Sequence, residues 1–368
     1  MFACHFPGLR DDLAQSIGIK MPTIPVQAPP SIKHDCPGLD SPVFILGCPR
    51  SGTTLLYHML VSSGHFVNYR AEVHAFSLIG PKFGQLTDRR DRQRFLNMWL
   101  PSNYSKKTNL NRDLLRRAIL DSCHSTADFL AVVMRLMAEA QGRRRWAECT
   151  PANVFYLKQI HAAFPRARFI HMVRDGRDVA LSLTRQRWIS PLPWDSQHRL
   201  PVAALFWQRN VSIGTRDGSQ LGSAYREVRF EDLVRAPRTT LQEVAEFVEE
   251  DLDYDFITAN PVGSVEHPNT SFGADDDFSP VGRWHEGMSD AELFHVERLI
   301  GNSLIAKDYQ LSRGRGAALP APSSLKRFTY KTIWRLRHWW RNKTVMGRFT
   351  DMELIRKATA PVNLPQTA

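Results

Sequence analysis

The sequence predicts an α/β protein built as a three-layer sandwich, with a central parallel sheet and helices on both faces. Short apolar segments alternate with amphipathic helical segments of about ten to fifteen residues along most of the chain. Hydrophobic residues make up 43% of the 368 residues, which is enough to bury a sizeable core. Strands that alternate with helices favour parallel pairing, because each helix returns the chain across one face of the sheet.

The first strand and the first helix enclose a glycine-rich turn. In "FILGCPRSGTTLLYHML", residues 44–60, an apolar strand over 42–47 is followed by a helix over about 53–63. Such a turn directs backbone N–H groups into one concavity, where the helix dipole adds partial positive charge. The side chains of the turn add a forked guanidinium and short hydroxyl donors. The predicted anion site consists of Pro49, Arg50, Ser51, Gly52, Thr53 and Thr54.

The turn differs from a nucleotide-triphosphate loop at one position. In the pattern G-x-x-x-x-G-K-[ST] the lysine reaches the terminal phosphates and the next hydroxyl holds magnesium. Here Thr53 stands in place of that lysine, and Arg50 is the cation of the loop. The sequence therefore predicts a P-loop-type fold that does not handle a γ-phosphate. A P-loop nucleotide kinase is one alternative, but no strand ends in a clear magnesium-binding aspartate.

Further strands and helices follow a largely helical, basic region at about 88–142. The predicted strands are 145–150 ("RWAECT"), 167–174 ("ARFIHMVR") and 225–230 ("YREVRF"). The predicted helices are 153–164, 175–188 and 231–250, and within the last of these Pro237 marks a helix start.

A second basic site follows the strand at 167–174. Arg174 stands at the carboxyl end of this strand, the edge of an open parallel sheet where ligands bind. Ser182 lies about two turns into the next helix. Asp175 and Asp178 are close enough in sequence to act as salt-bridge partners instead. Taken alone, this segment does not separate an anion site from a structural ion pair.

Taken together, the two segments resemble the signature of sulfotransferases that use 3′-phosphoadenosine 5′-phosphosulfate (PAPS). The resemblance covers about residues 42–310, and its wording from Thr150 to Ser182 is closest to the carbohydrate, protein-tyrosine and bacterial branch. It implies that "PRSGTT", Pro49 to Thr54, wraps the 5′-phosphosulfate and that Arg174 and Ser182 hold the 3′-phosphate. It further implies sulfuryl transfer to the hydroxyl of a glycan, lipid, peptide or small metabolite, without magnesium.

The resemblance also implies a general base on the segment after the first helix, "NYRAEVHAF", residues 68–76. Glu72 matches the base best, and His74 is the competitor, because alternation in an extended segment places both on one face. A salt bridge from Glu72 to a nearby arginine is the structural alternative. Arg50 would neutralise charge on the leaving oxygens, so the catalytic candidates are Glu72, His74 and Arg50.

Two later segments extend the predicted cofactor site, and one position departs from the family. Arg283, in "SPVGRWHEGMSD" at 279–290, is a candidate contact of the 3′-phosphate, and Phe230 stands where the small-phenol branch has a tyrosine that meets the adenine. Cys149 replaces a lysine that many relatives carry. A catalytically degenerate protein that binds PAPS or another polyanion is therefore a further alternative.

Charge and cysteine usage set the remaining expectations. A net charge of +11 favours anionic partners, but no nucleic-acid-binding module is present, so no nucleic-acid partner is predicted. The five cysteines are scattered without metal spacing, which predicts free thiols and no metal site. Neither a secretory signal nor a membrane-spanning apolar run is found, so a cytoplasmic protein is expected.

The chain divides into three predicted parts. These are an extended N-terminal arm at 1–41, a sulfotransferase domain at 42–311 with an acceptor-side helical insertion at about 88–142, and a basic aromatic tail at 312–368. Residues 313–348 carry ten Lys or Arg, no acid, and Trp334, Trp339 and Trp340. This composition suits an interfacial helix on an anionic membrane, and it equally suits a helix whose tryptophans pack on the core.

Overall fold

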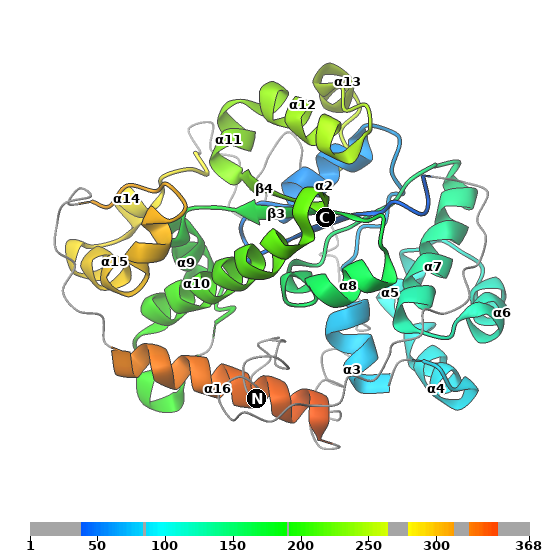
Figure 1. Ribbon diagram of the computed structural model, residues 1–368, viewed down its shortest axis with the longest axis horizontal. Helices are drawn as coiled ribbons and strands as arrows, with labels where there is room; N and C mark the ends of the chain where they lie inside the picture. The colour runs from blue at the N-terminus through cyan, green and yellow to red at the C-terminus, as the bar shows by residue number, and fades with distance from the viewer. Residues whose placement is uncertain (1–37, 84–85, 190, 264–278, 313–323, 345–368) are drawn as a thin grey trace, which may run out of the picture.

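The computed structural model describes residues 38–83, 86–189, 191–263, 279–312 and 324–344. A four-stranded parallel sheet in the order β2-β1-β3-β4 forms its centre (Figure 1). The strands are β1 Val43–Gly47, β2 Ala147–Glu148, β3 Arg168–Val173 and β4 Tyr225–Arg229. The predicted N-terminal arm lies outside the described residues except for 38–41.

The register of the sheet brings the predicted site segments to one edge. Gly47, the last residue of β1, pairs with Met172, and Val173 at the end of β3 pairs with Arg229 at the end of β4. The turn after β1, Arg174 after β3 and Phe230 after β4 therefore leave the sheet side by side. This carboxyl edge is where open parallel sheets bind ligands.

Helices cover both faces of the sheet, which confirms the predicted three-layer fold. Side chains of β1 alternate, with Phe44 and Leu46 in one core and Val43 and Ile45 in the other. One face is covered by α2 Thr53–Ser62, α11 Phe230–Arg235, α12 Pro237–Val248 and α13 Tyr254–Ala259 (Figure 1). The other face is covered by α8 Leu157–Ala163, α9 Gly176–Arg185 and α10 Arg199–Gly218.

The helical region predicted at about 88–142 forms a cluster at one end of the sheet (Figure 1). Its aromatic centre packs Phe129 against Phe95 and Trp99, with ring centroids 4.8 and 5.1 Å apart. Side-chain caps from Asp88, Ser102, Asn111 and Ser125 begin the four helices. The helices are α4 Arg89–Trp99, α5 Asn103–Lys106, α6 Arg112–Ser122 and α7 Thr126–Gln141, preceded by a π-helical turn Ala75–Ile79 and α3 Gly80–Phe83.

Several predicted boundaries need correction. The helix start predicted at Pro237 is confirmed by α12, but the residues before it form the separate helix α11, because Ala236 before the proline avoids the helical region (φ −134°, ψ 62°). The helix predicted over 153–164 is a 3₁₀ turn Pro151–Phe155 followed by α8, divided at Tyr156 (φ −124°). The strand predicted over 225–230 ends at Arg229 because Phe230 begins α11, and the strand predicted over 145–150 keeps only two residues.

The last part of the fold returns to the carboxyl edge and then crosses the outside of the molecule. Helices α14 Trp284–Gly287 and α15 Asp290–Ile305 pack beside α9 and α10, and α16 Ser324–Lys343 runs along α10 toward α3 (Figure 1). Two short 3₁₀ turns, Pro193–Asp195 and Ser219–Ala224, precede and follow α10. Within the described ranges, no helix has the length and apolarity needed to cross a bilayer.

Candidate functional site

The glycine-rich turn after β1 is held in a conformation that requires glycine at Gly52. Gly47, Arg50 and Gly52 all have positive φ values, of 146°, 74° and 90°. A Cβ placed on Gly52 would lie 2.2 Å from Cδ2 of Phe230, so the turn packs directly against that ring. Ser51 N–H donates to the Cys48 carbonyl at 3.1 Å and closes the turn. Helix α2 then begins at Thr53 with its N-terminus at the carboxyl edge of the sheet.

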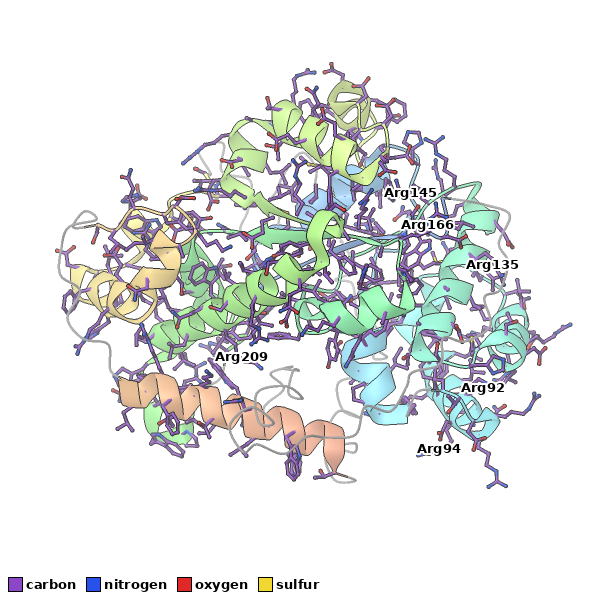
Figure 2. All side chains as sticks on the ribbon, in the orientation of Figure 1. Arg92, Arg94, Arg135, Arg145, Arg166 and Arg209 are labelled. Atoms are coloured by element: carbon purple, nitrogen blue, oxygen red, sulfur yellow. The ribbon has the colours of Figure 1, made fainter. Side chains whose placement is uncertain are left out.

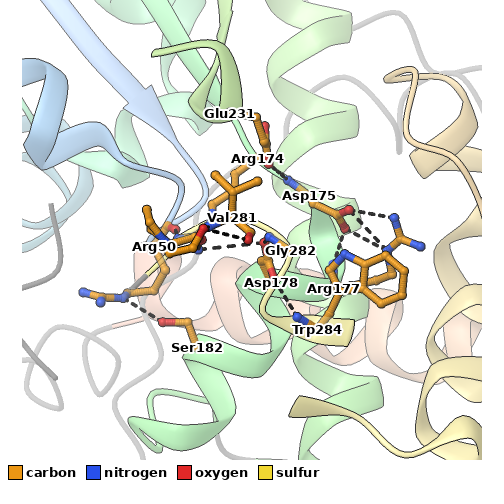
Figure 3. Close-up of polar contacts among 12 residues, drawn as sticks. Arg50, Arg174, Asp175, Arg177, Asp178, Ser182, Glu231, Val281, Gly282 and Trp284 are labelled. Atoms are coloured by element: carbon orange, nitrogen blue, oxygen red, sulfur yellow. Dashed lines mark hydrogen bonds and ion pairs between the residues drawn. The ribbon is translucent and has the colours of Figure 1, made fainter. Parts of the chain in front are cut away.

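Arg50 connects this turn to α9. Its Nε donates to the hydroxyl oxygen of Ser182 at 3.1 Å (Figure 3), and its guanidinium lies 5.7 Å from the ring centroid of Trp188. The structure therefore brings Arg50 and Ser182, 132 residues apart, into direct contact at the predicted cofactor site.

Arg174 ties the turn to the segment before α14. Its Nη1 donates to the carbonyl of Arg50 at 2.9 Å, its Nη2 donates to the carbonyl of Pro280, and its guanidinium stacks 4.4 Å from the centroid of Phe230. A carboxylate oxygen of Asp178 lies 4.0 Å away. Guanidinium groups carry five N–H donors, so Arg174 retains donors after these contacts. Its buried Nε has no hydrogen-bond partner among the described residues.

The segment that carries Arg283 is anchored to α9. The Asp178 carboxylate accepts the backbone N–H groups of Gly282 and Trp284, each at 2.9 Å (Figure 3). Trp284 is buried under the guanidinium of Arg177, 3.7 Å from its ring centroid. Trp284 thus packs in the core, while Arg283 is left beside the basic cluster.

Positive charge is concentrated at this edge. The pKa of Arg50 is lowered by burial and then by the charges of Arg174 and Arg283. Burial also lowers the pKa of Arg283, and Arg185 acts in the same direction. Neighbouring positive guanidinium groups repel one another, and a bound anion would relieve that repulsion. The buried Ser51 hydroxyl also has no hydrogen-bond partner within the described part of the chain, so the site offers donors as well as charge.

Glu72 and His74 form a contacting pair and are not separated alternatives. A carboxylate oxygen of Glu72 lies 3.1 Å from Nε2 of His74, and Nδ1 of His74 lies 3.1 Å from the Ser77 hydroxyl. The Glu72 side chain is 46% exposed and that of His74 is 13% exposed, so the carboxylate is accessible to a substrate. The ion-pair partner of Glu72 in the described structure is therefore this histidine.

Cys149 links the Glu72 segment to the turn. Burial first, and then the charge of Glu72, raise the pKa of its thiol, while the Thr53 side chain acts in the opposite direction. Burial raises the pKa of this thiol well above its ordinary value, so Cys149 is neutral at physiological pH. The position where many relatives carry a lysine therefore supplies no positive charge here.

Glu148 is a site residue that the sequence analysis missed. It is 2% exposed and accepts the N–H groups of Val73 at 3.4 Å and Thr150 at 3.2 Å. The side chains of Thr150 and Asn153 also donate to it. Burial raises the pKa of this carboxyl to about 7, although the Thr150 hydrogen bond and the His74 charge oppose the shift. Glu148 therefore holds the backbone between Glu72 and His74. The sequence signal that could have identified Glu148 was an acidic residue within a predicted buried strand.

Phe230 is buried at 2% exposure and contacts both the turn at Gly52 and the guanidinium of Arg174. Its predicted contact with adenine stays a prediction.

No group of three or more His, Cys, Asp and Glu side chains is placed to hold a metal ion within the described ranges, and the predicted lack of a metal likewise stays a prediction.

A cavity of about 660 Å³ lies at the opposite edge of the sheet, lined by residues that include Ser41, Arg145 and the first residue of β3, Arg168. Two of its arginines pair with acids of the same cavity, Arg144 with Glu250 and Arg168 with Glu249. The lining carries four arginines and two glutamates, so only part of its positive charge is compensated.

Comparison with known proteins decides the family. The model of the sulfotransferase family matches residues 42–254, which is more than half of the chain. The chain belongs to the sulfotransferase family. The glycine-rich turn, Arg174 and Ser182 all lie inside the matched region. A comparison with curated protein sequences finds no match.

Solved sulfotransferases are similar in structure at low sequence identity. The sulfotransferase domain of the curacin biosynthetic pathway is 17% identical with a TM-score of 0.50, over 74% of this chain and 98% of that domain. The sulfotransferase domain of the Synechococcus PCC 7002 olefin synthase is 22% identical with a TM-score of 0.47, over 84% of this chain and 98% of that domain. The first of these supports the shared fold.

Proposed function

We propose that this sulfotransferase uses PAPS to sulfate a hydroxyl acceptor. The observation that carries the proposal is the convergence of Arg50, Arg174 and Arg283 with Ser182 at the carboxyl edge. Partly desolvated guanidinium groups that lower one another's pKa favour a ligand with separate anionic groups. A donor with a 5′-phosphosulfate and a 3′-phosphate meets that requirement and needs no lysine in the turn.

Each end of the donor has its own set of residues in this proposal. The backbone N–H groups of the turn, with Ser51, Thr53 and Thr54, bind the 5′-phosphosulfate at the N-terminus of α2. Arg174, whose buried Nε has no hydrogen-bond partner among the described residues, and Ser182, whose hydroxyl accepts from Arg50, would hold the 3′-phosphate. Arg283 supplies further charge to that group.

Glu72 serves as the general base, and His74 positions it. The Glu72 carboxylate accepts the proton of the acceptor hydroxyl, while Nε2 of His74, 3.1 Å away, hydrogen-bonds the carboxylate and fixes its orientation. Glu148 holds the same segment through the Val73 N–H. PAPS supplies the sulfuryl group and a bisphosphate leaving group when bound. With PAPS bound, Arg50 and the backbone N–H groups of the turn would neutralise the negative charge that develops on the bisphosphate leaving group.

The test is transfer of ³⁵S from labelled PAPS to a panel of glycan, lipid, peptide and small-molecule hydroxyl acceptors. We expect label transfer with the wild-type protein and none with Glu72→Gln, at unchanged affinity for adenosine 3′,5′-bisphosphate. Equal transfer by the two proteins would contradict the assignment of the base.

Cys149 favours a second candidate function, which is binding of PAPS without transfer. The neutral thiol leaves the turn without the lysine of many relatives. In this case the wild-type protein would bind adenosine 3′,5′-bisphosphate but transfer no label to any acceptor. Transfer that appears only in Cys149→Lys would support the degenerate protein over the active enzyme.

A further inference from the structure

Helix α16 has two apolar faces, and one of them packs on the body of the protein. Tyr330 and Trp334 are 3% and 5% exposed, with ring centroids 5.4 Å apart. Trp334 also lies 6.2 Å from the ring of Phe206 in α10. This inner face joins the main hydrophobic core of the molecule.

Polar contacts fix the helix in place. The hydroxyl of Tyr330 donates to the Asp195 carboxylate at 2.7 Å and accepts the Leu192 N–H at 3.1 Å. Nζ of Lys326 lies 3.0 Å from the same carboxylate. The helix is therefore docked in one orientation, and its opposite side is held toward solvent.

That opposite side is apolar. Five of the nine large hydrophobic side chains that are exposed in the described structure belong to α16. At 100° per residue they fall within an arc of about 120°, on the other side of the helix from Trp334. We call this set the outer face of α16: Leu325 (75% exposed), Phe328 (67%), Leu336 (58%), Trp339 (52%) and Trp340 (40%).

Basic residues flank the outer face on both sides. Helix α16 contains seven Lys or Arg and no acid. On the same helical projection Lys331 and Arg335 border one edge of the outer face, and Arg337 borders the other edge, where Lys326 is already paired with Asp195. The apolar arc with basic margins is the pattern of a helix that lies in a membrane interface.

One arginine of the body lies close to the helix. Arg209 of α10 lies on the side of α10 that faces α16 (Figure 2). Burial lowers its pKa to about 10, and the charge of Arg335 in α16 acts in the same direction. Arg209 and Arg335 are therefore near enough for their positive charges to interact.

Trp194 is a further exposed tryptophan whose sequence neighbour contacts α16. It is 75% exposed and directly precedes Asp195, the residue that holds Tyr330 and Lys326. The tryptophan is therefore tied to α16 through its neighbour.

We propose that the outer face of α16, together with Trp194, docks the protein on the surface of a bilayer that contains anionic lipids. Tryptophan and phenylalanine insert at the boundary between headgroups and acyl chains, and the flanking bases pair with anionic headgroups. A second copy of the chain fits this face less well, because each helix would bring basic margins and no acid to the contact. The proposal stands independently of the sulfotransfer reaction.

The experiment is vesicle co-sedimentation of the full chain with phosphatidylcholine vesicles, with and without about one-third phosphatidylglycerol. We expect at least about tenfold tighter binding to the anionic vesicles, weakened by salt, with a blue shift of tryptophan fluorescence. The variant Leu336→Ser/Trp339→Ser should lose at least about tenfold of this affinity. The matched control Leu114→Ser/Phe256→Ser removes two other exposed side chains, 46% and 48% exposed, and should bind as the wild type does.

Thermal unfolding of each variant shows whether the substitutions leave the fold intact. A second variant, Lys331→Gln/Arg337→Gln, removes two charges and keeps every apolar side chain. This charge variant should lose the preference for anionic vesicles. Equal binding of the wild type to neutral and anionic vesicles, or no binding to either, would overturn the proposal. A concentration-dependent dimer that the Leu336→Ser/Trp339→Ser variant abolishes would assign the face to a second copy instead.

Discussion

Replacing Gly52 by alanine tests whether the glycine-rich turn depends on its contact with Phe230. The new Cβ would lie 2.2 Å from Cδ2 and 2.8 Å from Cε2 of Phe230, at a φ of 90°. The left-handed backbone costs a side chain about 1–2 kcal/mol, and overpacking against a buried ring costs about 1–3 kcal/mol more. We therefore expect Gly52→Ala to lower the free energy of unfolding by about 2–5 kcal/mol and to weaken adenosine 3′,5′-bisphosphate binding.

Gly142→Ala is the matched control for this prediction. Gly142 also has a positive φ, of 60°, but a Cβ there meets no atom within 4 Å, so only the backbone cost applies. Urea unfolding of both variants measures the difference, which should be about 1–3 kcal/mol. In the double variant Gly52→Ala/Phe230→Ala, the cost should be smaller than the sum of the two single costs. Equal losses at Gly52 and Gly142, or strict additivity with Phe230→Ala, would refute the steric reasoning.

Three further predictions concern the site. Arg174→Lys should weaken adenosine 3′,5′-bisphosphate binding at least about tenfold more than AMP binding, because one ammonium cannot replace the guanidinium fork; calorimetry that gives equal losses for both ligands would remove the 3′-phosphate assignment. His74→Gln should lower kcat less than Glu72→Gln, for which we expect a loss of about 10²–10⁴-fold with cofactor affinity retained; steady-state kinetics that reverse this order would make His74 the base. Because the pKa of Glu148 is raised from 4.5 to about 7 in the folded protein, the free energy of unfolding should fall as pH rises through this window. Glu148→Gln should flatten that slope in urea unfolding at pH 5 to 7, and an unchanged slope would contradict the shifted pKa.

Much of the fold could be predicted because its signals are local. The apolar runs of β1 and β3 and the glycine-rich turn between β1 and α2 lie where the sequence placed them, within a residue or two. The start of α12 at Pro237 was predicted from that proline, whereas α11 before it was not predicted as a separate helix. The split at Tyr156 has no such local signal, because the surrounding residues suit a helix.

The site was predicted as a set of residues more accurately than as a set of contacts. The family resemblance implied that Arg50 and Ser182 bind the same donor, but the hydrogen bond between their side chains depends on how α9 packs beside the turn. Glu72 and His74 were weighed as competitors, and their 3.1 Å contact could be found only in three dimensions. Glu148 was missed because its importance rests on the Val73 N–H that it accepts.

The same limit applies to α16. Its composition predicted either a membrane contact or packing on the core. In the structure Trp334 is buried, while Trp339 and Trp340 are exposed. Which side of α16 packs on the body depends on the hydrogen bond between Tyr330 and Asp195. These residues are 135 positions apart, so sequence periodicity could not predict their contact.

Calorimetric titration with adenosine 3′,5′-bisphosphate, without magnesium and at two salt concentrations, tests the central claim most directly. AMP and ATP serve as controls because neither carries a 3′-phosphate. The account predicts saturable one-to-one binding of the bisphosphate, at least about tenfold tighter than either control, because Arg174, Arg283 and Ser182 converge on that group. Binding of ATP as tight as that of the bisphosphate would contradict the account and favour a nucleotide kinase-like protein.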